Sequence, residues 1–312
     1  MKSKLIWGII LLFLLSSITQ ITQSNEVSYN NIIYVDDDNI DGPWNGTIDN
    51  PYKHIQEAVD NAKDNDTIFV NEGLYNENIF IHKTIKLLGE NRDNTIVDGG
   101  GICEKDCIFI LTEANMVIIS DFTIQNSGDA DSGGDFDSGI DIRSSNNIII
   151  NNNISNNGNL GIQLFNSDGN NISYNTFYNN DRAGIEAENS KNNFIFNNVF
   201  ANNTEWGVMF HLTGESTSNV IMRNNFIDNL RGIAFVKQTG NEILKNNFIN
   251  NIGGNARSDF DIFSATPIFN NKWNENYWDD KTNLDIKFIP GFLSINIDFN
   301  PVNEPYNNQG GV

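Results

Sequence analysis

Basic residues are scarce in this sequence. Its 312 residues include 19 Lys and Arg against 40 Asp and Glu, which gives a net charge of −21 at pH 7. This deficit argues against nucleic acid as a partner, because binding to phosphates needs lysine and arginine. It equally argues against docking on anionic lipid through a charged surface. The balance is compatible with cation binding and with an extracellular protein.

Long apolar runs are nearly absent as well. One run extends from Leu5 to Leu15 and follows Lys2 and Lys4. A charged start before a short apolar stretch is typical of a signal peptide, and the stretch is short for a membrane span. No clear cleavage site follows, so we expect residues 1–24 to be either a signal peptide or an uncleaved N-terminal anchor. The protein is therefore predicted to be secreted or at the cell surface, with membrane contact only through this segment.

Cysteine is limited to Cys103 and Cys107. In an exported chain, two cysteines this close can form a local disulfide, and the alternative is two free thiols. A single pair supplies too few ligands for a structural zinc site.

A repeat fills the middle of the chain. Each unit opens with a glycine followed by an aliphatic residue, as in Gly161-Ile162, with a further apolar residue two positions on, as in Leu164. The opening glycines are spaced 22 to 25 residues apart and are Gly139, Gly161, Gly184, Gly207 and Gly232. Apolar residues with a period of two indicate a strand with one buried face. Units this short cannot bury that face alone and must stack, so the repeat predicts an all-β protein, a parallel β-helix.

Two further columns recur in these units. An aliphatic column comprises Ile150, Ile172, Ile195, Ile221 and Ile243, and an asparagine column comprises Asn153, Asn175, Asn198, Asn224 and Asn246. In the preceding coil Phe122 takes the asparagine position. Asparagine tolerates left-handed backbone angles at corners, and its amide can bond to the same residue in the next coil. We therefore expect one asparagine ladder along the stack.

The ends of the chain differ from the repeat. Residues 25–66 are expected to form an N-terminal segment with a capping helix, residues 67–278 the β-helix, and residues 279–312 an aromatic C-terminal cap and tail. For the helix, Asn50 is the predicted N-cap and Pro51 the first helical residue. An apolar stripe of Ile55, Ala58, Val59 and Ala62 would face the first coil.

Several stretches resemble a known family. The segment IYVDDDNIDGPWNGTIDNPYKHIQEAVDNAKDNDTIFVNEGLYNENI (33–79) resembles the N-terminal part of right-handed parallel β-helix proteins of the pectate-lyase-like superfamily. The Gly-Ile and Asn repeats, with NENYWDD (274–280), resemble the NosD-type domain, also called the carbohydrate-binding and sugar-hydrolysis (CASH) domain. The resemblance implies a single-stranded right-handed β-helix, common on microbial cell surfaces. It implies little about activity, because this scaffold hosts lyases, hydrolases, epimerases and proteins without known chemistry.

The outward positions of the Gly-Ile strands are the candidate functional surface. They form one column of Asp141, Gln163, Glu186, Met209 and Ala234 and a second of Arg143, Phe165, Glu188, His211 and Val236. Glu186 and Glu188 point the same way, roughly 7 Å apart. That spacing suits the acid and base of an inverting glycosidase, with Arg143 as a third catalytic candidate. The alternative is an ordinary solvated strand face, on which Asp141 and Arg143 form a surface ion pair. If the face binds sugar, Asp141, Gln163, Phe165, Met209 and His211 are the expected contacts.

Calcium is the one cofactor that the sequence suggests. DDNIDG (37–42) matches the first half of an EF-hand-type loop, with Asp37, Asn39 and Asp41 as ligands. Ile48 stands where the bidentate glutamate would be, so an Asx-rich turn is the alternative. The insertion GDADSGGDFDSG (128–139) could also hold calcium or overhang the strand face.

Copper is associated with NosD-type proteins, but this chain offers few ligands for it. Met209 and His211 share a face, and two ligands do not make a copper site. The leading hypothesis is therefore a surface β-helix protein that binds carbohydrate or other surface partners without catalysis. The alternatives are a polysaccharide hydrolase or lyase, and a purely structural spacer. The oligomeric state is left open.

Overall fold

The computed structural model describes residues 31–102, 105–132, 135–211, 214–259, 271–280, 286–290 and 296–308. The predicted signal peptide or anchor lies outside these residues, as does Cys103. Cys107 is a buried free thiol whose Sγ lies 2.9 Å from the Gln125 carbonyl oxygen.

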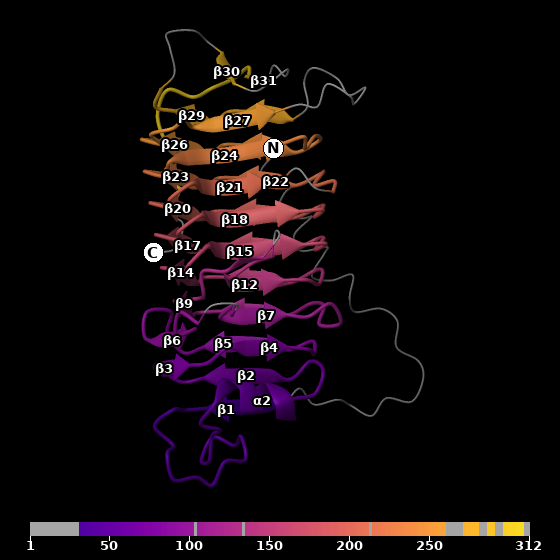
Figure 1. The fold of residues 1–312 in the computed structure, drawn as a ribbon, viewed down its shortest axis with the longest axis vertical. Helices are drawn as coiled ribbons and strands as arrows, with labels where there is room; N and C mark the ends of the chain where they lie inside the picture. Colours follow the sequence, from indigo (N-terminus) through magenta and orange to yellow (C-terminus); the bar gives the residue numbers. More distant parts are fainter. Residues whose placement is uncertain are drawn as a thin grey trace, which may run out of the picture. The chain divides into compact units, whose positions relative to one another are not determined.

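The described residues form three sheets, parallel except for the antiparallel β30–β31 pair, with one two-stranded hairpin and one short helix. The chain visits the three sheets in turn, so successive coils stack along the strand-pairing direction (Figure 1). Sheet 1 contains β1 (Ile32–Val35), β2 (Thr67–Val70), β5 (Lys86–Gly89), β8 (Ile118–Ser120), β13 (Ile148–Ile150), β16 (Asn171–Ser173), β19 (Phe194–Phe196), β22 (Val220–Met222), β25 (Glu242–Leu244), β28 (Lys272–Asn274), β31 (Asn296–Asp298) and β30 (Lys287–Ile289). Sheet 2 contains β3 (Gly73–Asn76), β6 (Thr95–Asp98), β9 (Thr123–Gln125), β14 (Asn153–Ser155), β17 (Thr176–Tyr178), β20 (Val199–Ala201), β23 (Asn225–Ile227), β26 (Asn247–Ile249) and β29 (Tyr277–Trp278). Sheet 3 contains β4 (Ile79–Ile81), β7 (Ile108–Ile110), β12 (Ser138–Ile142), β15 (Leu160–Phe165), β18 (Ala183–Glu188), β21 (Trp206–Phe210), β24 (Arg231–Val236) and β27 (Ala256–Asp259), and the hairpin is β10 (Asp131–Ser132) with β11 (Asp135–Phe136). The prediction of an all-β parallel β-helix is confirmed.

The interior is filled by side chains that stack in columns from coil to coil. Ile140, Ile162, Ile185 and Ile233 are fully buried beneath sheet 3. Phe177, Phe200, Phe226 and Phe248 stack with ring centroids 4.7, 5.0 and 4.9 Å apart, and Trp278 continues the stack at 4.4 Å. Parallel offset rings at these separations add to the stabilisation from burial. In-register pairing of the repeats is what aligns them.

Three buried asparagine ladders run along the stack, where the sequence predicted one. In each, the Oδ1 of an asparagine accepts the backbone N–H, and in most rungs also the side-chain N–H, of the asparagine one coil before. The ladders comprise Asn147, Asn170, Asn193, Asn219, Asn241 and Asn271; Asn152, Asn175, Asn198, Asn224, Asn246 and Asn276; and Asn157, Asn180, Asn203, Asn229 and Asn251. These bonds satisfy corner amides that would otherwise be buried without partners.

The first predicted rung was wrong by one residue. Asn152, not Asn153, is in the ladder, and correspondingly Ile149 rather than Ile150 pairs with Ile172. Phe122 does take the asparagine position one coil earlier, because its N–H donates to Asn152 Oδ1.

The left-handed corner residues are also displaced from the predicted position. Asn151 (φ 56°) and Asn197 (φ 54°) adopt the left-handed conformation, each directly before a ladder asparagine. Tyr174, Arg223 and Lys245 occupy the same corner in other coils with φ between 56° and 59°. The ladder asparagines are therefore selected for their amides, and the residue before each one bears the backbone strain.

The N-terminal helix is shorter than expected. Helix α2 (Ile55–Asn61) begins after His54, so Asn50 is not its N-cap and Pro51 is not helical. The Glu77 carboxylate, from the loop before β4, instead accepts the N–H groups of Ile55 and Gln56. This arrangement satisfies two free helix N–H groups with a charge that the helix dipole favours.

The predicted apolar stripe of this helix is buried, as expected. Strand pairing reaches beyond the predicted 67–278 region at both ends, because β1 pairs with β2 and β31 pairs with β28.

Candidate functional site

The outer face of sheet 3 carries the predicted site residues in rows. Strand register places Asp141, Gln163, Glu186, Met209, Ala234 and Arg257 in one row. Phe165 pairs with Glu188 in a second row, and Arg143 and His211 directly follow β12 and β21. A third row contains Ser138, Leu160, Ala183, Trp206 and Arg231. The predicted alignment is confirmed for the first row and, in the second, for Phe165 with Glu188.

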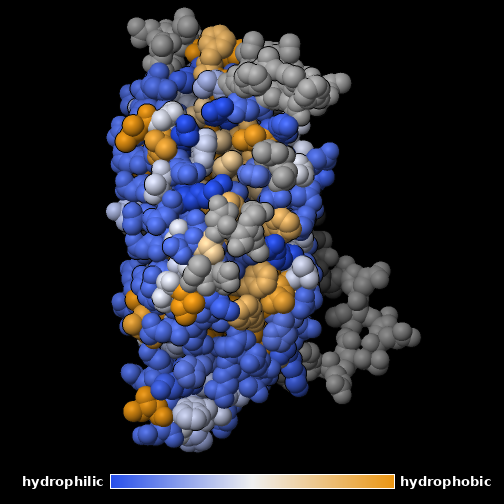
Figure 2. Space-filling view, in the orientation of Figure 1, coloured by the Kyte–Doolittle hydropathy of each residue, from blue (hydrophilic) through white to orange (hydrophobic). Residues whose placement is uncertain are grey.

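The expectation that these positions form a solvated surface was wrong for part of the face. Asp141, Gln163 and Glu186 are only 1–2% exposed. The same face carries an apolar cluster separate from the core, made of Phe136, Leu160, Ala183, Trp206 and Ala234, with Met209 packed against it. Phe136 comes from the β10–β11 hairpin, so part of the 128–139 insertion does overhang this face. Figure 2 shows this side of the molecule, where hydrophobic side chains gather in patches within a hydrophilic surface.

Asp141 and Arg143 form an ion pair at β12. Arg143 Nε and Nη2 donate to Asp141 Oδ2 at 2.9 and 2.7 Å. The guanidinium also lies over the Phe165 ring, 4.6 Å from its centroid. Because Asp141 is buried, the pair is far better shielded from water than the predicted surface ion pair.

Glu186 is held by a second arginine. Arg182 Nε donates to Glu186 Oε2 at 3.1 Å, and the Arg182 guanidinium lies 4.0 Å from the centroid of the Phe136 ring. Burial raises the pKa of the Glu186 carboxyl above its ordinary value of 4.5. Glu188 adds to this increase, whereas the charges of Arg182 and His211 act against it. A buried carboxyl with a raised pKa beside a second carboxylate is the arrangement that general acid catalysis uses.

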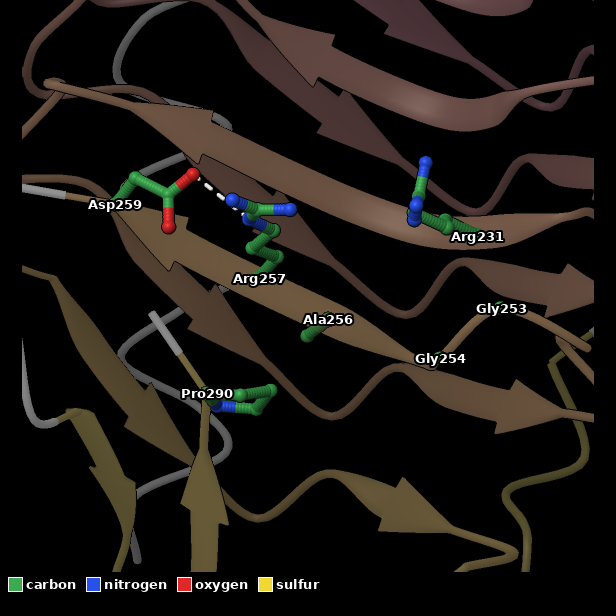
Figure 3. A pocket seen from close by; sticks show the side chains of 7 residues that line it. All are labelled: Arg231, Gly253, Gly254, Ala256, Arg257, Asp259 and Pro290. Atoms are coloured by element: carbon green, nitrogen blue, oxygen red, sulfur yellow. Dashed lines mark hydrogen bonds and ion pairs between the residues drawn. The ribbon is translucent and has the colours of Figure 1, made fainter. Parts of the chain in front are cut away.

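The same face ends in a cleft that the sequence did not reveal. A cavity of about 440 Å³ lies over β24 and β27, lined by Arg231, Arg257 and Asp259 among others. Figure 3 shows both arginines rising from the backbone there, with Ala256, Gly253 and Gly254 adding little side-chain bulk. This cleft is hard to find from the sequence alone, because Asn255-Ala256 stands where earlier coils have Gly-Ile.

Two of the predicted calcium ligands, Asp37 and Asn39, bond to residues outside their loop. Asp37 Oδ2 accepts the Leu74 N–H at 3.1 Å, and the Asn39 side-chain N–H donates to the Pro51 carbonyl at 2.7 Å. Across the residues described here, no group of three or more His, Cys, Asp or Glu side chains could hold a metal ion. Calcium at Asp37, Asn39 and Asp41 stays a prediction.

Comparison with known families agrees with the coil architecture. The family model described as "Right handed beta helix region" matches residues 92–258. The chain belongs to the right-handed β-helix family. The expected fold and resemblance are thereby confirmed, while the NosD-type branch stays a prediction.

Solved structures of this β-helix type are similar in fold. An alginate lyase from Paenibacillus sp. str. FPU-7 superposes with a TM-score of 0.61 at 14% identity, over 73% of this chain and 85% of that one. The A-module of the Azotobacter vinelandii mannuronan C-5 epimerase AlgE6 gives a TM-score of 0.49 at 15% identity, over 72% and 81%. The pectate lyase Pel9A gives 0.44 at 16% identity, over 82% and 73%. At 14% identity the likeness to the alginate lyase establishes the β-helix fold alone.

The comparison with curated proteins found no match. In the described part of the β-helix chain, no helix is long and apolar enough to cross a bilayer.

Proposed function

We propose that this β-helix protein binds polysaccharide along the outer face of sheet 3, and that it does so without catalysis. The observation that carries the proposal is the pairing of arginines with aromatic rings on one face. The chain has six arginines, of which Arg143, Arg182, Arg231 and Arg257 lie there. Three of them stack on rings, namely on Phe165, Phe136 and Trp206.

Such a surface suits sugars because it combines two kinds of contact. The partly exposed ring of Phe165 can pack against the apolar face of a sugar ring, and guanidinium forks bond to hydroxyl or acid groups. The ion pairs fix the arginines in place before any ligand arrives, which lowers the entropic cost of binding. The β-helix neighbours named above act on polysaccharides, and this agrees with the proposal.

We further propose that the protein works outside the cytoplasm. The support is the charged start and apolar run of residues 1–24, together with the acidic composition. No nucleic acid partner is proposed, and membrane contact would be through that segment alone.

A second candidate function is cleavage of a polysaccharide, with Glu186 as general acid and Glu188 as base. The raised pKa of Glu186 favours it, because a carboxyl that keeps its proton can donate it to a leaving group. Arg143 would then bind substrate or stabilise charge, and calcium would be an optional cofactor.

A glycan array probed with the purified protein tests the first function. We expect binding to a restricted set of polysaccharides, weakened by Phe165→Ala, because that change removes the ring beneath Arg143. Tyr178→Ala provides the control, since Tyr178 is an exposed aromatic residue on sheet 2. Silence across all glycans would leave the spacer as the remaining function.

Cleavage is tested by incubating polysaccharides with the protein, with and without calcium. Reducing ends report hydrolysis, and absorbance of unsaturated products reports a lyase. Turnover that is unchanged in the Glu186→Gln, Glu188→Gln double variant would remove these two residues as the catalytic pair.

A further inference from the structure

We infer that Arg231 selects an anionic group of the ligand, which is seated in the cleft over β24 and β27. This inference rests on the proposed function, since it specifies which polysaccharides the face accepts. The ligand would be a polysaccharide that carries carboxylate or sulfate groups.

Three of the four arginines on this face are paired with carboxylates. Arg143 pairs with Asp141, Arg182 with Glu186, and Arg257 with Asp259, where Nε lies 2.7 Å from Oδ2. Each of these arginines therefore already faces a carboxylate. Arg231 has no ion pair within the described residues and lies over the Trp206 ring at 4.8 Å. A stacked guanidinium keeps N–H groups at its edge for a planar acceptor.

The residues that line the cleft carry a net positive charge. Its two arginines and one aspartate leave one uncompensated positive charge among the lining residues. That charge stands out in a chain whose net charge is −21. An anionic ligand would be repelled by most of the surface and attracted here, so the cleft discriminates by charge.

The residues beside the two arginines of the cleft are small. Gly253, Gly254 and Ala256 line the cleft without long side chains, and Figure 3 shows the side chains of Arg231 and Arg257 beside them. A Cβ atom added at Gly254 would meet nothing within 4 Å. The guanidinium edges can therefore be reached by a group attached to a bulky ring.

The cleft continues the proposed binding face along sheet 3. Arg257 occupies the same row as Glu186, three strands further along. Three strand spacings correspond to roughly 14 Å, a distance that a short oligosaccharide can span. Trp206 belongs to the apolar cluster and also carries Arg231, so it joins the two parts of the face.

Calorimetric titration of the full chain with matched polymers tests the inference. Polygalacturonate and its fully methyl-esterified form share a backbone and differ in charge, and dextran sulfate with dextran provides the sulfate pair. We expect the wild type to prefer the charged member of at least one pair, and the preference to fall with added salt. Loss of a charge-assisted bidentate contact should weaken binding of that member about tenfold in Arg231→Gln. Binding of the neutral member should not change.

The control variant is Arg223→Gln. Arg223 lies over the Phe196 ring at 6.0 Å on sheet 1 and does not line the cleft, so its loss should leave all affinities unchanged. Arg231→Lys keeps the charge without the fork and should fall between the wild type and Arg231→Gln. The pair that responds to Arg231 identifies carboxylate or sulfate as the group recognised.

Two negative results have different meanings. If charged and neutral polymers bind equally well, or if Arg231→Gln weakens both alike, the role of Arg231 is overturned while the binding face stands. If no polymer binds, both the proposed function and this inference are overturned. Far-ultraviolet circular dichroism of each variant guards against loss of folding.

Discussion

The neighbouring residues Asn152 and Asn153 provide a sharp test of the ladder. Asn152 is fully buried, its Oδ1 accepts the Phe122 N–H at 3.0 Å, and its Nδ2 donates to the Ile119 carbonyl at 3.0 Å. Asn152→Ala leaves these two buried groups without their side-chain partner. Each orphaned group costs about 1–3 kcal/mol, so the expected loss of unfolding free energy is about 2–6 kcal/mol.

Asn153→Ala is the matched control. Asn153 lies on β14 and is half-buried, and its side chain makes one long contact, 3.5 Å, to Thr123 Oγ1. We expect a change within about 0.5 kcal/mol for this variant.

Thermal unfolding and urea titration of the two variants would measure the difference. At roughly 2 °C per kcal/mol for a chain of this size, Asn152→Ala should lower the Tm by about 4–12 °C, and Asn153→Ala by about 1 °C or less. Equal losses in the two variants, or a larger loss in Asn153→Ala, would refute the ladder as a source of stability.

Two further predictions concern the core and the site. Phe200→Ala removes a fully buried ring stacked on both sides, so it should cost about 3–5 kcal/mol in urea titration, and a loss below about 1 kcal/mol would contradict the stack as a stabilising element. Because burial raises the pKa of Glu186, its contribution to stability is present at low pH and is lost as pH rises above its ordinary value of 4.5 towards the raised value. The Tm of the wild type minus that of Glu186→Gln should therefore fall as pH increases from about 4, and a difference independent of pH would show that the carboxyl titrates normally.

The coil architecture could be predicted because its signals are local. Gly161-Ile162 and Leu164 repeat at a nearly constant interval, and a strand period of two then fixes which residues face inward. The ladder residue was predicted one position too late, at Asn153, because Asn151, Asn152 and Asn153 are all asparagines. Only pairing with the next coil distinguishes them.

The two missed ladders did leave a signal. Asn170, Asn175 and Asn180 are spaced five apart, and the same spacing recurs in the following coils. Three-residue strands separated by corners generate this interval, so the pattern can be found without a structure.

The candidate site was less predictable because its burial depends on distant residues. The row that holds Glu186 followed from register, but the cover over it comes from Phe136 in an insertion and from the conformation of Arg182. Among the arginines described on this face, Arg257 pairs with Asp259 and Arg231 has no ion pair, and this difference depends on side-chain geometry that the sequence does not specify.

The second asparagine ladder also bears on how such a protein can change over generations. Its rungs are joined across 23, 26, 22 and 30 residues from Asn175 to Asn276, yet the bond between rungs is the same each time. Extra residues are thus accommodated between successive rungs without disturbing the asparagine ladder. A whole coil can therefore be added by gene duplication or removed by deletion, because the coils on either side still present the same ladder asparagine to each other. The length of the molecule, and with it the length of its outer face, can therefore vary by recombination within the gene. The outward-facing side chains of each coil can vary by point mutation.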